Sequence, residues 1–204
     1  MKILLLIAAL AAAGSAWAQG TSEAIPDYTQ SAVAPPQSAT AGWTFEATTN
    51  LMALDLGCFT NVFLGNPVTD VKVGLWASDG TLLASTDITP ASTLFGHSFY
   101  EAINPVALSP GEIYHVGVFA PPDGILSLDP SIFGDFSTTP DISVRGTAVA
   151  VAGFAFPVET QPLDGAIYAD PNFRYQEGVP EPSSGLLLSL GGLLLVARRG
   201  YQRR

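Results

Sequence analysis

The residues with the most reactive side chains are few and widely spaced. The chain has two histidines, His97 and His115, and one cysteine, Cys58. Two histidines without a spaced third ligand make a poor zinc site, and no Cys-x-x-Cys pair is present. His115 falls in a strand-like run and Cys58 among apolar residues, so both are expected to have structural roles, with Cys58 a buried thiol.

Hydrolase motifs are weak in this sequence. The closest approach to a Gly-x-Ser-x-Gly elbow is Gly96-His97-Ser98-Phe99-Tyr100, where Tyr100 replaces the second glycine. The elbow also requires a turn from strand to helix, and no helix is predicted here. Carboxylate pairs for glycoside hydrolysis cannot be recognised by spacing, because their separation is a three-dimensional property. We therefore predict no catalytic residues and a non-enzymatic protein, with a carbohydrate-active enzyme as the less favoured alternative.

Four aspartates recur every six residues and lie close to Gly or Pro: Asp123, Asp129, Asp135 and Asp141. Carboxylate oxygens in loops are the ligands that Ca²⁺ prefers, which makes these four the weak calcium candidates. The Asp-x-Asp-x-Asp-Gly loop is absent, and capping of solvated turns is the favoured interpretation of the four. No other cofactor is predicted.

Aromatic residues could stack against sugars, although most aromatics in a small β domain belong to the core. Trp76 is the exception. If Val71, Val73 and Leu75 face inward, alternation turns Trp76 outward beside the Asp79-Gly80 turn. Trp76 is therefore the candidate for glycan contact, and an extracellular polysaccharide is a candidate partner.

Charge excludes one class of partner. Residues 19–178 contain three basic and 17 acidic residues, a formal charge of −14. A surface this acidic repels phosphate backbones, so we expect no nucleic-acid partner. The chain is 48% hydrophobic and 13% charged, which argues against disorder and for one packed domain.

Short alternating runs between Gly, Pro, Asp and Asn dominate the middle of the chain. Strands are predicted at 43–47, 52–58, 71–76, 81–86, 98–103, 113–119, 142–151, 166–169 and 172–176, with an edge strand near 32–34. In the second run Met52, Leu54, Leu56 and Cys58 are expected to share the apolar face. Tight turns are expected at Asp79-Gly80 and Pro110-Gly111. The pattern predicts an all-β antiparallel β-sandwich, jelly-roll-like, over 41–178 after a flexible leader at 19–40.

The N-terminal residues 1–18 read as a secretory signal peptide. Lys2 precedes an apolar run from Ile3 to Ala13, and small residues follow. The Ala-x-Ala pattern predicts cleavage between Ala18 and Gln19 by signal peptidase after Sec export. An uncleaved signal anchor is the alternative, but the apolar run is short for a membrane span.

The C-terminal residues 179–204 have three parts in order. A polar motif at 179–184, which includes Val179-Pro180-Glu181-Pro182, precedes an apolar stretch at 185–197 and an arginine-rich tail at 198–204. Thirteen helical residues reach about 20 Å, so this is a short transmembrane helix, and its arginines favour the cytoplasmic side. We expect transient inner-membrane anchoring with the rest of the protein outside.

This arrangement resembles the PEP-CTERM sorting signal of Gram-negative bacteria. The resemblance covers 179–204 and implies recognition by an exosortase, with cleavage near Pro180 to Pro182 and delivery to the envelope, surface or extracellular matrix. A plain C-terminal membrane anchor is the alternative.

A second resemblance concerns the middle of the chain. Gly42-Trp43-Thr44-Phe45, Val73-Gly74-Leu75-Trp76 and Leu108-Ser109-Pro110-Gly111-Glu112 are among segments similar to a bacterial domain of unknown function. The similarity covers about residues 40–120 and implies a β-sandwich without assigned catalytic residues. A secreted carbohydrate-binding module or a calcium-dependent adhesion module is the alternative function.

Overall fold

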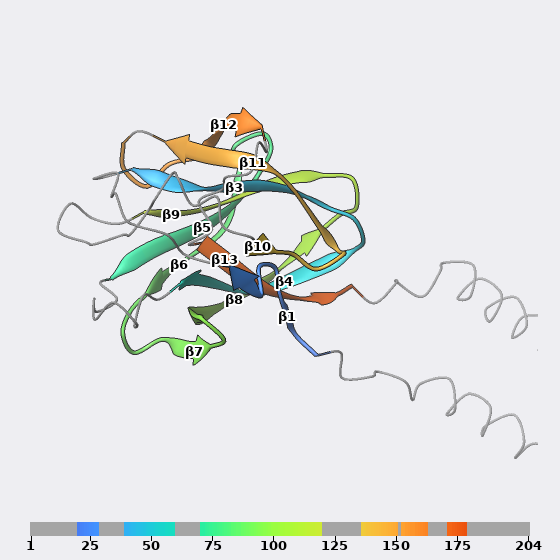
Figure 1. Ribbon diagram of the computed structural model, residues 1–204. Coiled ribbons are helices and arrows are strands. Elements are labelled where there is room, and N and C mark those ends of the chain that lie inside the picture. The colour runs from blue at the N-terminus through green and yellow to red at the C-terminus, as the bar shows by residue number, and fades with distance from the viewer. Residues whose placement is uncertain are drawn as a thin grey trace, which may run out of the picture.

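The computed structural model describes residues 20–28, 39–59, 70–119, 136–150, 152–162 and 171–178, and all regular structure in them is β-strand (Figure 1). The strands are β1 Ser22–Glu23, β2 Asp27–Tyr28, β3 Thr40–Ala47, β4 Leu51–Phe59, β5 Val71–Ala77, β6 Leu82–Ile88, β7 Thr93–Phe95, β8 Ser98–Leu108, β9 Ile113–Phe119, β10 Phe136–Ser137, β11 Ile142–Ala150, β12 Val158–Pro162 and β13 Pro171–Glu177.

The strands form two antiparallel sheets. One has the order β1-β13-β4-β8-β7, and the other has the order β12-β11-β3-β9-β5-β6, while β2 pairs separately with β10. The predicted all-β class is therefore confirmed. The part of the chain that the structure describes contains no helix long and apolar enough to cross a membrane. The helices expected at both ends and the strands expected at 32–34 and 166–169 lie outside the described residues.

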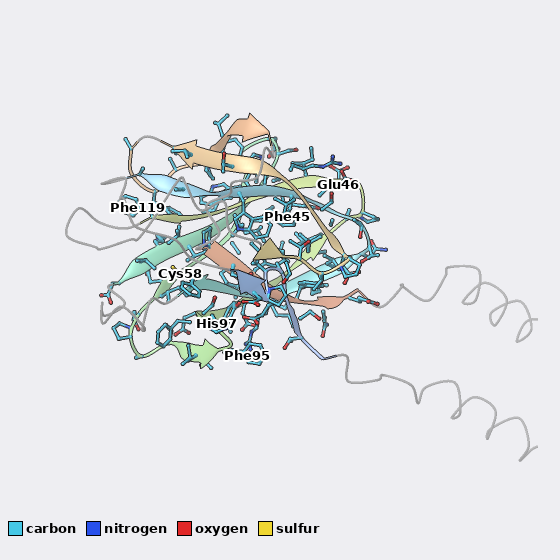
Figure 2. The ribbon with its side chains drawn as sticks, viewed as in Figure 1. Phe45, Glu46, Cys58, Phe95, His97 and Phe119 are labelled. Atoms are coloured by element: carbon cyan, nitrogen blue, oxygen red, sulfur yellow. The ribbon has the colours of Figure 1, made fainter. Side chains whose placement is uncertain are left out.

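The core lies between the two sheets and is dominated by aromatic rings. The Phe173 ring of β13 lies 6.0 Å from Trp43 and 4.9 Å from Phe45, both on β3 of the other sheet. Figure 2 shows Phe45 between the two layers. The Trp43 indole N–H donates to the carbonyl of Pro171 at 2.7 Å, which satisfies its buried polar atom. Each of these fully buried rings contributes about 2 to 3 kcal/mol through the area it removes from water.

Strand β4 corrects one expectation about the core. Leu51 and Ala53 are buried there, whereas Met52 and Leu54 are only half-buried. Leu54 is an extra residue relative to β13, because Ala53 pairs with Tyr175 while Asp55 pairs with Arg174. This bulge shifts the alternation by one residue, so Leu56 and Cys58 face the core but Met52 and Leu54 do not. The continuous apolar face from Met52 to Cys58 was therefore a wrong prediction.

The two predicted tight turns are confirmed. At Asp79-Gly80 the glycine adopts a φ of 87°, and the Asp79 carboxylate accepts the Thr81 backbone N–H at 2.9 Å. This hydrogen bond and one from the Thr81 side chain lower the pKa of Asp79, because they stabilise the ionised carboxylate. At Pro110-Gly111 the glycine φ is 81°. Both φ values lie in the left-handed region that glycine tolerates best.

A row of glycines crosses the outer face of the six-stranded sheet. Gly42 of β3 pairs with Gly117 of β9, and Gly117 pairs with Gly74 of β5. A Cβ atom at Gly42 would lie 1.9 Å from the carbonyl oxygen of Val116, and one at Gly74 would lie 2.3 Å from the Trp76 ring. The missing side chains therefore let the backbones of β3 and β9 approach closely at Gly42, and they leave room for the Trp76 indole at Gly74.

The glycine row generates a stability prediction. Gly42→Ala is expected to lower the free energy of unfolding by about 3 kcal/mol, because the new methyl group meets the backbone of β9 rather than a movable side chain. Gly20→Ala is the matched control, since a Cβ atom there meets nothing within 4 Å, and it should change stability by less than about 0.5 kcal/mol. Urea unfolding of both variants measures the difference. Equal stability of the two would contradict the close approach.

Candidate functional site

Most of the residues singled out for sorting and calcium binding lie outside the described part. These are Ala18 and Gln19 of the signal cleavage site, the motif Val179, Pro180, Glu181 and Pro182, and the aspartates Asp123, Asp129 and Asp135. Asp141 is described, and its carboxylate accepts a hydrogen bond from the Tyr175 hydroxyl at 3.0 Å. Thr139 also hydrogen-bonds that hydroxyl. Among the described residues no group of three or more His, Cys, Asp or Glu could hold a metal ion.

The segment that approached a hydrolase motif forms a hairpin. Phe95 pairs with Ser98, so Gly96 and His97 make a two-residue turn between β7 and β8. Gly96 has a φ of 56°, and Ser98 is buried in β8. A nucleophile elbow requires a strand followed by a helix, and this serine begins a second strand instead.

His115 and Cys58 are both buried. His115 is 7% exposed in β9, and its ring is 4.6 Å from the Phe156 ring. Cys58 is 2% exposed in β4 and packs in the core. Burial keeps the thiol away from solvent, and the predicted buried cysteine is confirmed.

Trp76 does not face solvent, which corrects its expected exposure. As predicted, alternation places Trp76 on the outer face. Its ring lies beside Gly74 there, but only 3% of Trp76 is exposed. The Phe154 ring covers it at 5.2 Å, and the Lys72 ammonium group lies over that ring at 5.1 Å. Thr40 anchors the covering loop by donating to Gly153 O at 2.7 Å and accepting from the Ala155 N–H at 3.1 Å. A bound sugar would therefore meet Phe154 before it met Trp76.

A group of polar and aromatic side chains lies on the outer face of the other sheet. We call it the Arg174 cluster, and its members are Glu23 of β1, Asp55 of β4, Phe95 of β7, Tyr100 of β8 and Arg174 of β13. Arg174 pairs in register with Glu23 on one side and with Asp55 on the other. The three side chains therefore extend from neighbouring positions on three adjacent strands.

The Arg174 guanidinium is held by charge and by aromatic rings. It donates its Nε–H to Asp55 Oδ2 at 3.1 Å, and its Nη2 forms an ion pair with the same oxygen at 3.0 Å. It also lies over the Phe95 ring at 5.1 Å and over the Tyr100 ring at 5.0 Å. Stacking of guanidinium on aromatic faces adds to the ion pair because the group is weakly hydrated.

Tyr100 crosses the sheet to reach Glu23. Its ring packs over Gly57 of β4, where a Cβ atom would lie 2.3 Å from the ring carbon Cδ1. The hydroxyl then donates to Glu23 Oε1 at 2.7 Å. Figure 2 shows Phe95 and His97 near the β7–β8 turn.

Burial shifts the pKa values of two members of the cluster, Tyr100 and Glu23. Burial raises the pKa of the Tyr100 hydroxyl, and the neighbouring Glu23 carboxylate raises it further. Burial also raises the pKa of Glu23, against the opposing effects of the Tyr100 hydrogen bond and the charges of Arg174 and His97. Tyr100 thus remains a neutral donor at physiological pH. The cluster binds strands together, since Tyr100 donates to Glu23 and Arg174 donates to Asp55.

Local sequence patterns gave no indication of this cluster. Arg174 and Asp55 are 119 residues apart, and Tyr100 and Glu23 are 77 residues apart. The one available signal was the scarcity of cations, because Arg174 is one of three basic residues among 17 acidic residues between 19 and 178.

The buried pairing yields a prediction about stability. Arg174→Met is expected to cost about 3 kcal/mol, because it leaves Asp55 unpaired in a largely buried site. Arg174→Met with Asp55→Asn should be more stable than Arg174→Met alone, since no unpaired charge then remains. Arg145→Met is the control: the Arg145–Glu46 pair is exposed, so its loss should cost less than about 1 kcal/mol. Equal losses for Arg174→Met and Arg145→Met in urea unfolding would refute this account.

Comparison with known proteins places the chain in a family. No curated protein and no solved structure matches. One family model matches residues 23–168, a range that begins at Glu23 of β1 and extends past β12. A domain of unknown function was expected over about residues 40–120, and the match reaches beyond both ends of that range. The chain belongs to the family described as domain of unknown function DUF4082.

Proposed function

We propose that this is a non-enzymatic exported protein whose sandwich, jelly-roll-like in type, is delivered to the cell surface or extracellular matrix by an exosortase. The observation that carries the proposal is the order of segments in the sequence: a basic residue and an apolar run within 1–18, and a Pro-Glu-Pro motif, an apolar stretch and an arginine-rich tail at 179–204. Signal peptidase and exosortase are the processing partners. The protein is anchored transiently in the inner membrane by its C-terminal helix before release.

The end of the sandwich supports this route. Strand β13 ends at Glu177, and the Gly178 backbone N–H donates to the Asn50 carbonyl at 2.6 Å. The ordered domain therefore reaches the residue directly before Val179. A processing enzyme would find the motif beside the folded domain without a long intervening linker.

Attachment by the C-terminal transfer also fits the charge of the domain. A sandwich with a formal charge of −14 is repelled by anionic polymers, so ion pairing cannot hold it in such a matrix. Neutral sugar contact is the second candidate function. The half-buried rings of Phe154 and Phe156 on the outer face favour it, because they offer apolar surface where Trp76 does not.

The sorting proposal predicts where a motif variant accumulates. Replacing Pro180, Glu181 and Pro182 with alanine should leave the protein in the inner membrane fraction of the native host. Replacing Pro35 and Pro36, a proline pair in the leader, is the matched control and should leave sorting unchanged. Mass spectrometry of the extracellular wild-type protein should find residues 186–204 removed, and their recovery there would end the proposal.

Sugar contact predicts a different outcome. A variant ending at Gly178, added from outside, should fail to bind isolated matrix if C-terminal transfer provides attachment. Binding that is lost on Phe154→Ala would favour the carbohydrate-binding alternative. Trp76→Ala is unsuitable for this purpose, since loss of a buried indole costs about 3 to 5 kcal/mol and destabilises the domain whether or not a sugar binds.

A further inference from the structure

The first residues of the described chain form a strap along the edge of the five-stranded sheet. We call residues 20–28 the N-terminal strap. Ala24 donates its backbone N–H to the Phe173 carbonyl at 2.9 Å. The Asn172 amide accepts from the Ile25 N–H at 3.1 Å and donates to the Ile25 carbonyl at 2.8 Å. Ala24 and Ile25 are 0% and 2% exposed, so the strap closes the edge of β13 and covers part of the core.

One carboxyl group fastens the strap to the outer face of the sheet. Glu23 Oε1 accepts the Tyr100 hydroxyl at 2.7 Å. Its other oxygen packs against the β7–β8 turn, because a Cβ atom at Gly96 would lie 2.9 Å from Glu23 Oε2. The carboxyl group therefore lies between β8 and the turn, where it is part-buried and less solvated than it would be in an open strap.

The charged and titratable groups facing Glu23 come from four elements. Tyr100 lies on β8, Arg174 on β13 and His97 in the β7–β8 turn. Asp55 of β4 lies one strand further, where it accepts the Arg174 Nε–H and forms an ion pair with the guanidinium. Arg174 thus hydrogen-bonds Asp55, and its charge acts on Glu23.

We propose that the N-terminal strap is a pH-dependent cover of the β13 edge, closed most firmly when the Glu23 carboxyl is protonated and loosened when it ionises. The protonated acid keeps its hydrogen bond, since a carbonyl oxygen accepts the Tyr100 hydroxyl as a carboxylate oxygen does. The protonated acid also avoids the desolvation penalty of a part-buried charge. An opened strap exposes the Phe173 carbonyl and the Asn172 amide, the kind of unpaired edge to which another strand adds.

The sign of the pH dependence follows from the shift in pKa. Burial raises the pKa of Glu23 above its ordinary value of 4.5 while the strap is closed, and opening returns it toward that value. A group whose pKa is raised in the closed state stabilises that state at acid pH. This stabilisation is lost as pH rises from about 4.5 through the raised pKa.

Hydrogen exchange read by mass spectrometry on the full chain in detergent tests the proposal. The opening constant of a peptide covering residues 20–28, corrected for intrinsic exchange, should rise between pH 4.5 and 7.5. The rise should be up to tenfold for each unit by which closing raises the Glu23 pKa. A peptide covering β9 should keep its protection throughout, because Val116 and Val118 are in the core.

Two matched variants separate the carboxyl group from general charge repulsion. Glu23→Gln should give a flat profile, since the amide oxygen accepts from Tyr100 without titrating. Asp27→Asn removes one exposed carboxyl group from the same strap and should keep the wild-type profile. A pH dependence that persists in Glu23→Gln, or is lost in Asp27→Asn, would overturn the proposal.

Tyr100→Phe provides a second arm that leaves Glu23 in place. Loss of the hydroxyl removes the hydrogen bond but keeps the ring over Gly57 and beneath Arg174. The strap should open more at every pH and remain pH-dependent. Unchanged strap protection in Tyr100→Phe would show that the contact does not fasten the strap.

Discussion

A single guanidinium ties together the five-stranded sheet. Arg174 of β13 bonds Asp55 of β4, lies over Tyr100 of β8 and Phe95 of β7, and acts through its charge on Glu23 of β1. Each of the five strands thus contributes one member of the cluster. Acidic residues outnumber basic ones so strongly in this domain that a largely buried carboxylate rarely has a cation within reach. Arg174 therefore stabilises the Asp55 carboxylate in its largely buried position on the sheet.

The two outer faces of the sandwich are covered in different ways, and neither follows the usual division into a buried and a solvated face. On the five-stranded sheet, Gly57 leaves space for the Tyr100 ring to cross β4. On the six-stranded sheet, Gly74 and Gly117 leave space for the Trp76 indole beneath the loop that carries Phe154. Glycine in both sheets acts as the partner of one large aromatic ring. This explains why large rings are buried outside the core as well as inside it.

Alternation in the sequence predicted strands where the local pattern is regular, and it failed where distant segments decide the environment. Strands β3, β5 and β9 lie where the apolar period of two places them. The bulge at Leu54 was invisible, because it is defined by the pairing of β4 with β13. Trp76 has the predicted orientation, yet Phe154 covers it from 78 positions further along the chain. Contacts of this range depend on topology, which a period of two does not encode.

The position of β13 links the stability of the sheet to the proposed sorting route. β13 is the last described strand, but it lies inside the sheet between β1 and β4, so the sheet is complete only when both ends of the domain are in place. Ser22 pairs with Tyr175, which brings the N-terminal strap next to the residues just before the proposed sorting motif. In the sequence Pro180 comes three residues after Glu177, the last residue of β13. Pulling on the motif would therefore load β13 directly, and the Arg174 cluster resists that load because it fastens this strand to its neighbours on both sides.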